Sequence, residues 1–167
     1  MKNLFLTLAL IATFFTGKAQ EKEYSIYVPL QTYHLDRRAN VLSHYVDGEG
    51  GNIGAILNIT TRMEGIYLRE LSTGVFRNSF GRPALIIQQN FGLEKNNIKA
   101  MFGMGIATGY HLDSGFHNYD RLPKVMRNSG ILPTANVSIV YTKYRIRPTL
   151  VISPFFVNGG VTISLKK

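Results

Sequence analysis

The strongest constraint on the fold is an alternation of apolar and polar residues that recurs over segments of about nine residues. In the last of these segments, Val157, Val161 and Ile163 fall on one face of an extended chain, and Asn158 and Thr162 fall on the other. Successive side chains of a β-strand point to opposite faces, so this period predicts strands with one apolar and one polar face. Beyond residue 19 we find almost none of the three-four spacing of apolar residues that amphipathic helices show. The chain is therefore predicted to be all-β.

Eight segments carry this pattern. They are Ser25–Tyr33, Asn52–Ile59, Gly65–Phe76, Ala84–Phe91, Ile98–Tyr110, Leu132–Tyr141, Arg147–Ser153 and Val157–Leu165. Eight antiparallel strands can close on themselves, which removes unpaired edges and leaves an interior for side chains or one small ligand. In residues 100–108, the side chains on the face that carries Met101, Gly103 and Gly105 are mostly small, which predicts free space inside the barrel.

The links between these segments differ in length in an ordered way. The links after odd-numbered strands include the long segments 35–51 and 111–131, whereas 61–64, 92–97 and 143–146 are short turns. Long links at one rim and short turns at the other are typical of bacterial outer-membrane barrels. We therefore predict an eight-stranded antiparallel up-and-down β-barrel of the outer-membrane type. The alternative is a soluble calycin, which has the same strand count but polar residues on its outer face.

The N-terminus predicts export. Lys2 precedes the apolar run Leu4–Phe15, and small residues follow as far as Ala19, as in a secretory signal peptide. The apolar run is too short for a helix that crosses a bilayer, which needs about 20 residues. We expect residues 1–19 to be the signal peptide, residues 20–167 to be the β-barrel domain, and the exported protein to reside in the outer membrane.

The composition limits the partners. The chain has a formal net charge of +9 and no cysteine, so disulfides and thiolate metal sites are excluded. Export separates the positive charge from nucleic acid, and anionic lipid headgroups are the expected partner, although the charges could simply solvate the loops. A basic rim suits phosphate-bearing glycolipids. It would be formed by Arg37, Arg38, Arg121, Lys124 and Arg127. The histidines match no metal-binding spacing, and we expect no metal and no cofactor.

A candidate catalytic site lies at the rim with the long links. His34 ends the first predicted strand, and Asn78 and Ser79 follow the third, so all three belong to the same end of the barrel. A histidine within hydrogen-bond reach of a hydroxyl can accept its proton, which would support acyl transfer. Asp36 could orient the histidine ring. The simpler interpretation is that His34 is an interfacial polar residue and that 78–81 form an ordinary turn.

Short motifs along the whole mature chain resemble one family. They are Ile26-Tyr-Val-Pro-Leu-Gln-Thr-Tyr-His34, Gly65-Ile-Tyr67, Phe76-Arg-Asn-Ser-Phe80, Ile131-Leu-Pro-Thr-Ala-Asn136, Ser153-Pro154 and Asn158-Gly159. In this order they resemble the PagP-type lipid A palmitoyltransferases, which are eight-stranded outer-membrane barrels. One departure bears on the chemistry, because Asn78 stands where the family carries an aspartate, and an amide cannot accept a proton as a carboxylate does.

The resemblance implies an enzyme that moves a palmitoyl chain from a phospholipid donor to a lipid A acceptor. It implies His34 and Ser79 as the functional pair, with Asn78 as an orienting or oxyanion-contacting amide. In the family, prolines interrupt hydrogen bonding between strands and let lipids reach the interior sideways; Pro29, Pro133 and Pro154 occupy such positions here.

Three functions therefore remain open. The first is a lipid A acyltransferase-like enzyme, expected to be a monomer. The second is a non-enzymatic outer-membrane barrel used for lipid binding, adhesion or surface shielding, and the Asn78 departure favours it. The third is a secreted, calycin-like lipid-binding barrel.

Overall fold

The structure is a computed structural model that describes residues 21–34, 53–78, 83–109, 129–154 and 156–165. The predicted signal peptide lies outside these residues, as do most of the two long links. No helix among the described residues is long and apolar enough to cross a membrane.

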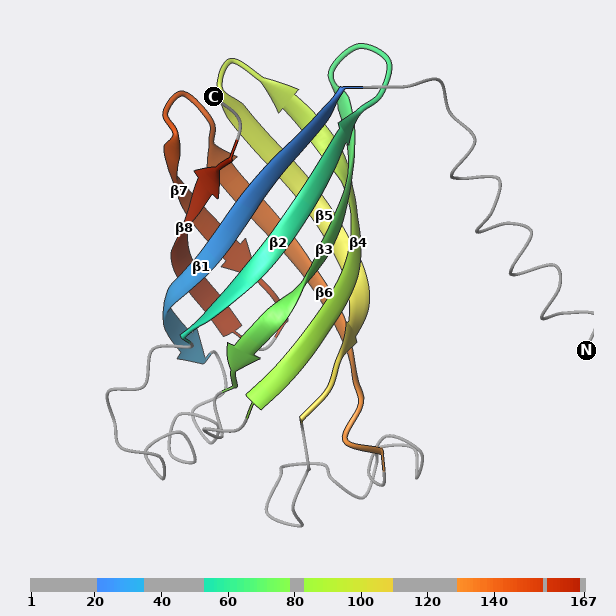
Figure 1. The fold of residues 1–167 in the computed structure, drawn as a ribbon, viewed down its shortest axis with the longest axis vertical. Helices are drawn as coiled ribbons and strands as arrows, with labels where there is room; N and C mark the ends of the chain where they lie inside the picture. The colour runs from blue at the N-terminus through green and yellow to red at the C-terminus, as the bar shows by residue number, and fades with distance from the viewer. Residues whose placement is uncertain (1–20, 35–52, 79–82, 110–128, 155, 166–167) are drawn as a thin grey trace, which may run out of the picture.

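The described chain forms eight β-strands. They are β1 (Lys22–His34), β2 (Gly54–Arg62), β3 (Tyr67–Arg77), β4 (Pro83–Lys95), β5 (Ile98–Ala107), β6 (Leu132–Tyr141), β7 (Ile146–Ile152) and β8 (Phe156–Ser164). Each strand pairs antiparallel with its neighbours in the sequence, and β1 also pairs with β8, so the sheet closes into a barrel in the order β1 to β8 (Figure 1). The predicted eight-stranded antiparallel up-and-down barrel is confirmed.

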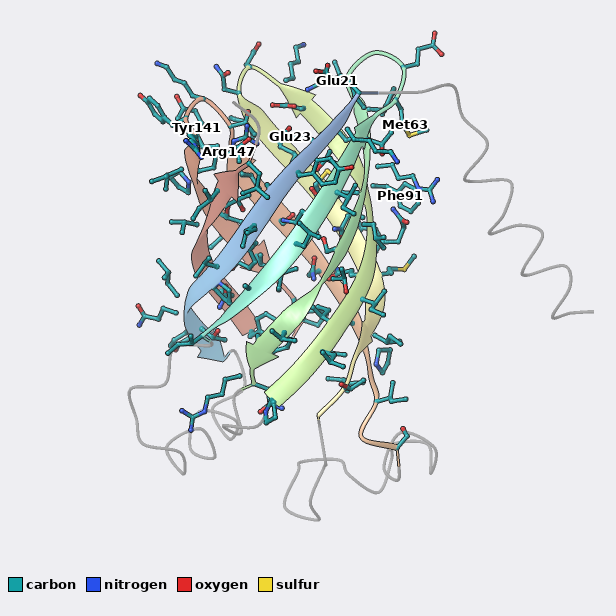
Figure 2. All side chains as sticks on the ribbon, viewed as in Figure 1. Glu21, Glu23, Met63, Phe91, Tyr141 and Arg147 are labelled. Carbon is teal, nitrogen blue, oxygen red and sulfur yellow. The ribbon has the colours of Figure 1, made fainter. Side chains whose placement is uncertain are left out.

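The polarity of the barrel is the reverse of that of a soluble barrel. Large apolar side chains such as Phe102, Met104 and Ile139 point outward and are exposed. Polar side chains such as Ser72 and Asn90 are buried inside. Figure 2 shows side chains along the whole outer wall. A soluble calycin would place polar residues outside, so this arrangement matches outer-membrane barrels and not the calycin alternative.

Both rims agree with the predicted difference in link length. The strand ends that precede the long links lie at the lower rim in Figure 1, and the short turns lie at the upper rim. We call these the long-link rim and the turn rim. The ends of β1 and β3, at or next to which the predicted catalytic residues lie, belong to the long-link rim.

One predicted turn is shorter than expected. We expected a turn over 92–97, but β4 continues to Lys95 and the chain reverses at Asn96 and Asn97. Both asparagines have positive φ, 51° and 62°, as required in a tight two-residue hairpin. Gly92 is instead a strand residue, and a Cβ there would collide with the backbone of β5 and with Met101.

The expected space beside the small residues of β5 is partly filled. A Cβ added at Gly103 would meet the side-chain amides of Gln88 and Asn90, which extend from β4 over this glycine. Met101, on the same face, is one of the largest fully buried side chains in the described part of the chain. The glycine therefore accommodates polar side chains of the barrel itself.

Candidate functional site

The predicted catalytic residues fall at the long-link rim, as expected. His34 is the last residue of β1 and pairs with Phe156 of β8, and Asn78 directly follows β3. The two strands end at the same rim and are separated by β2. Ser79 and Asp36 lie outside the described residues. The topology thus places His34 and Asn78 at one rim, and the pairing of His34 with the Ser79 hydroxyl stays a prediction.

Asn78 has a defined structural contact. Its side chain is 3% exposed, and its Nδ2 donates a hydrogen bond of 3.0 Å to the carbonyl oxygen of Gly109, just after β5. Gly109 has a φ of +83°, a conformation that suits glycine. This contact joins the ends of β3 and β5 across the beginning of β4. An amide that donates to the backbone in this way is what an ordinary structural asparagine does at a strand end.

The three prolines have different surroundings. Pro29 is buried inside the barrel, at a register shift in the pairing of β1 with β8. Pro133 points outward near the start of β6, and Pro154 is exposed just after β7. Only Pro29 faces the lumen.

The ladder between β6 and β7 is short. It joins Val137–Val140 of β6 to Thr149–Ile152 of β7, so residues 132–136 of β6 have no ladder partner on β7. Pro133 lies in this unpaired part, which pairs only with β5 on its other side. At the long-link half of the wall, two boundaries between described strands therefore lack ladder pairs: that between β6 and β7, and that between β1 and β2, where residues 28–34 of β1 have no partner on β2.

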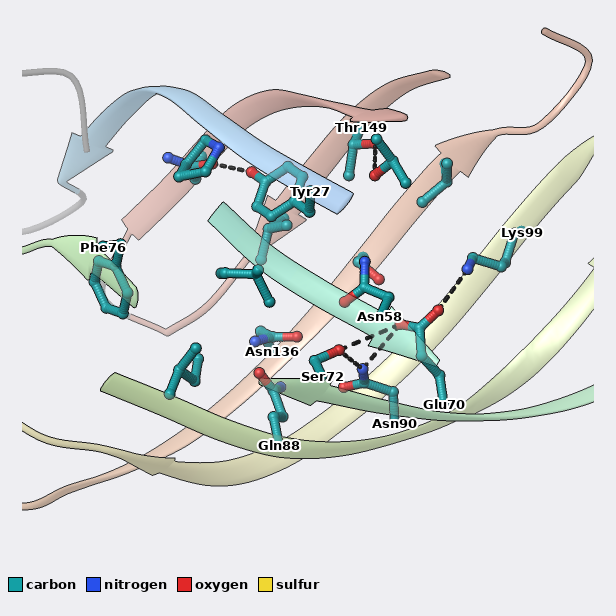
Figure 3. Close-up of a pocket in the computed structure, with 18 of the residues that line it drawn as sticks. Tyr27, Asn58, Glu70, Ser72, Phe76, Gln88, Asn90, Lys99, Asn136 and Thr149 are labelled. Atoms are coloured by element: carbon teal, nitrogen blue, oxygen red, sulfur yellow. Dashed lines mark hydrogen bonds and ion pairs between the residues drawn. The ribbon is translucent and has the colours of Figure 1, made fainter. Parts of the chain in front are cut away.

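The barrel interior contains a cavity of about 110 Å³. Its wall near the long-link rim is mostly apolar and is formed by Pro29, Ile56, Phe76, Ile86, Val151 and Phe156. Its deeper wall is polar and includes Asn58, Glu70, Ser72, Gln88, Asn90 and Lys99. Figure 3 shows Phe76 at one end of this space and Lys99 with Glu70 at the other. Small-molecule sites usually have about 300–1,000 Å³, so the cavity is small for a long acyl chain.

A buried ion pair forms the floor of the cavity. Lys99 Nζ lies 2.6 Å from Glu70 Oε2, and the two side chains are 4% and 5% exposed. The Thr60 hydroxyl donates to the same carboxylate over 2.6 Å, and Asn90 Nδ2 donates to its other oxygen over 3.0 Å. Asn90 also donates to the Ser72 hydroxyl over 2.7 Å. Burial of a charge is costly unless it is paired and hydrogen-bonded, and here both conditions are met.

A second polar cluster lies toward the turn rim. Glu94 accepts hydrogen bonds from Arg62 over 2.8 Å and from Thr142 over 2.6 Å. Glu23 forms an ion pair with Arg147. Beside these groups lies a further cavity of about 140 Å³, lined by Glu21, Glu23, Thr60, Arg62 and Leu68.

The lumenal ion pair was missed by the sequence interpretation. A signal was available, because Glu70 shares its strand face with Leu68 and Ser72, opposite the outward Leu71 and Val75. A charged residue on the inner face of a barrel strand needs a partner across the lumen. The partner was harder to identify, since Lys99 is on β5 and meets Glu70 of β3 across the intervening β4.

Nothing in this polar floor resembles a base next to a nucleophile. The Ser72 hydroxyl is 3.5 Å from the Glu70 carboxylate, too long for efficient proton transfer, and that carboxylate is already neutralised by Lys99. No group of three or more His, Cys, Asp or Glu side chains that could hold a metal ion occurs in the described parts of the chain. The floor is therefore a structural and electrostatic element.

Comparison with known proteins gives little beyond the fold. No family model and no curated protein matches the chain. Among solved structures, the chain is similar to the outer membrane protein Ail of Yersinia pestis, determined as a backbone structure in a phospholipid bilayer nanodisc. The two share 10% sequence identity, the match covers 87% of this chain and 100% of that chain, and the TM-score is 0.48. The resemblance to the PagP-type enzymes thus rests on the short sequence motifs alone.

Proposed function

We propose that the protein is a non-enzymatic, integral barrel of the outer membrane, exported through a cleaved signal peptide. One observation carries the membrane placement, namely the apolar outer wall around a polar lumen. Phe102, Met104 and Ile139 are each more than two-fifths exposed, and leaving such side chains in water across a whole barrel wall would be unfavourable. Lipid removes this cost, and closure of the barrel gives every strand a neighbour on both sides, so that most backbone groups of the wall are paired.

Two features of the site support a non-enzymatic role. The deeper half of the lumen is occupied by the hydrogen-bonded group around Glu70 and Lys99. An acyl chain that entered this half would remove water from these polar groups, which is costly in free energy. Asn78 replaces the carboxylate of the family that the motifs resemble, and its amide is hydrogen-bonded to Gly109. Loss of the acid and a polar lumen both favour binding or surface shielding over acyl transfer.

The long links would then carry the interaction with the outside. They contain the basic residues Arg37, Arg38, Arg121, Lys124 and Arg127, all outside the described residues. Guanidinium groups bind phosphate in a bidentate manner, so phosphate-bearing glycolipids of the outer leaflet are the partner that the charge of these links suits best. We place no metal, cofactor or nucleic acid in this function, and we expect the barrel to act as a monomer.

The membrane placement has a direct test. When the full chain is expressed in a bacterium with two membranes, we expect the mature protein to begin at Gln20 and to sediment with outer-membrane vesicles. It should stay with the membrane during extraction with alkaline carbonate, because its apolar wall is surrounded by lipid. N-terminal sequencing and immunoblots of the separated membranes give the result. Recovery of the mature protein in the soluble periplasmic fraction would overturn the proposal.

A second candidate function is the acyltransferase-like one, and one observation favours it. The unpaired part of β6, which contains Pro133, lies beside the apolar half of the cavity, so a lipid chain in the outer leaflet has a weak place in the wall next to it. In this hypothesis His34 is the base, Ser79 the hydroxyl and Asn78 the orienting amide. Asp36 orients the histidine ring, and Pro29, Pro133 and Pro154 assist lateral access. A phospholipid is the acyl donor and lipid A the acceptor.

Mass spectrometry of lipid A separates the two candidates. A host that makes lipid A would express the wild-type chain, His34→Ala or Ser79→Ala, at matched outer-membrane levels. Under our proposal, the three lipid A spectra are the same. A species heavier by one acyl chain, present with wild type and absent with both variants, would instead establish the transferase. If the heavier species appeared with all three, the acyl transfer would be real but the assignment of His34 and Ser79 wrong.

A further inference from the structure

The two cavities of the lumen approach each other at one layer of side chains. The cavity of about 110 Å³ is lined by Glu70 and Lys99, and the cavity of about 140 Å³ at the turn rim is lined by Thr60 and Leu68. Thr60 donates to Glu70 over 2.6 Å, so the two spaces meet at this hydrogen bond. A cavity needs only about 10–15 Å³ for one water molecule, so each of the two spaces can hold several.

The layer between the cavities is polar and can be rearranged. Its closing contact is the 2.6 Å ion pair of Lys99 with Glu70, and Lys99 also lies 3.4 Å from the Thr60 hydroxyl. Leu68, which is 2% exposed, completes the layer on the turn side. Lysine has a long flexible side chain, and its ammonium can move between partners without any change in the backbone.

Lys99 has a second carboxylate within reach. Glu94 of β4 and Lys99 of β5 are directly opposite in the ladder, so their side chains leave the sheet on the same face. The Glu94 carboxylate is held by Arg62 and Thr142 at the turn rim. Transfer of the Lys99 ammonium from Glu70 to Glu94 would keep the ammonium paired and would withdraw it from the layer between the cavities. The Glu70 carboxylate would keep only its hydrogen bonds from neutral groups such as Thr60 and Asn90, so this state would be rare in the wild type.

We propose that the barrel is a gated passage for water and small inorganic ions, in which the Glu70–Lys99 ion pair is the closed gate and Glu94 holds Lys99 in the open state. The passage runs from the long-link rim through the cavity, past Thr60, to the space beside Glu23 and Arg62. Gln88 supports a hydrated path, because its Nε2 is buried, lines the cavity wall and has no protein hydrogen-bond partner. Buried water in the path would supply that partner.

This proposal rests on the membrane placement, so insertion must be measured separately. The full mature chain would be folded into planar bilayers and, in parallel, into vesicles in which protection from protease reports insertion. In potassium chloride solution, we expect the wild type to show brief openings. Glu70→Gln keeps the shape of the side chain but removes its charge, so Lys99 would spend more time at Glu94. The open probability should rise at least about tenfold, which corresponds to 1.4 kcal/mol.

The opposite variant distinguishes a gate from a leak. Glu94→Gln removes the partner of the open state, so its open probability should fall below that of the wild type. A barrel that was merely loosened would leak more with either substitution. Lys143→Gln, which removes an exposed charge beside the Tyr144 ring on the turn between β6 and β7, should leave the openings unchanged.

A cysteine in the lumen tests the path itself. The chain has no cysteine, so Ser72→Cys introduces a single thiol, in the wall of the cavity. A positively charged methanethiosulfonate reagent should abolish the openings of this variant and leave those of the wild type unaffected. This measurement also decides the case if Glu70→Gln fails to insert.

Three results would overturn the proposal: no openings in an inserted wild type and an inserted Glu70→Gln, equal changes with Glu70→Gln and Glu94→Gln, or openings of inserted Ser72→Cys that persist after thiol modification. If the wild type were not inserted at all, the membrane placement would be the part that is wrong. The two failures are thus distinguishable.

Discussion

Replacement of Phe102 by lysine is expected to lower the free energy of unfolding in lipid vesicles by about 2–4 kcal/mol. Phe102 is in the middle of β5, points away from the lumen and is 48% exposed in the protein alone. Its ladder partners, Phe91 on β4 and Val137 on β6, also point outward and are exposed. This position therefore lies within the apolar wall, where a lysine ammonium would have to sit in hydrocarbon or reach for the interface.

A second lysine provides the matched control. Ile98 is the first residue of β5, at the turn rim, and it is 50% exposed on the same outer face. Near the membrane interface a lysine costs only about 0–1 kcal/mol, because its ammonium reaches the headgroups. The measurement is urea unfolding of Phe102→Lys, Ile98→Lys and wild type in vesicles, followed by far-ultraviolet circular dichroism. In a barrel surrounded by water, both lysines would be within about 0.5 kcal/mol of wild type.

This contrast reflects the part of the fold that the sequence could predict. In β8, the outward side chains Val157 and Val161 alternate with the buried Asn158 and Thr162, and a period of two fixes which face each residue occupies. The number of alternating segments also predicted the number of strands, because each segment is followed by a link or turn before the next one begins. A closed barrel could be predicted because an even number of antiparallel strands allows the first strand to pair with the last, which removes both unpaired edges of the sheet.

The ends of strands were less predictable. The sequence predicts a turn that begins at Gly92, whereas in the structure Gly92 is a strand position where the backbone of β5 comes too close for a side chain. The true reversal at Asn96 and Asn97 uses positive φ at both residues, which asparagine tolerates better than most residues. Close approach of two strands depends on register, and register is a property of the assembled barrel.

The candidate site shows the same limit. Rim topology could be read from the order of strands, so the placement of His34 and Asn78 at one rim was predictable. The bond from Asn78 to Gly109 could not be, because it joins strands that are separated by another strand. The Glu70–Lys99 pair was missed for the same reason, since side chains that meet across a lumen have no fixed spacing along the chain.

The energetic weight of that pair can be measured directly. Lys99→Met would leave the Glu70 carboxylate buried without its cation, with only the hydrogen bonds from neutral groups such as Thr60 and Asn90. Removal of one partner from a buried ion pair usually costs about 3–5 kcal/mol, because the remaining charge keeps its desolvation penalty and loses its compensation. We expect a loss of this size in the free energy of unfolding, measured by urea unfolding in vesicles.

The double variant decides whether the loss comes from the stranded charge. In Glu70→Gln combined with Lys99→Met, no charge remains, and the glutamine carbonyl can still accept hydrogen bonds from Thr60 and Asn90. Most of the lost stability should therefore return. Arg62→Met is the matched control, because it breaks the Arg62–Glu94 pair, in which the arginine is 48% exposed, and such pairs are worth about 0–1 kcal/mol. If Lys99→Met cost no more than Arg62→Met, the lumen around Glu70 would have to be filled with water that solvates the carboxylate. The dry layer between the two cavities, on which the closed state of the gate depends, would then not exist.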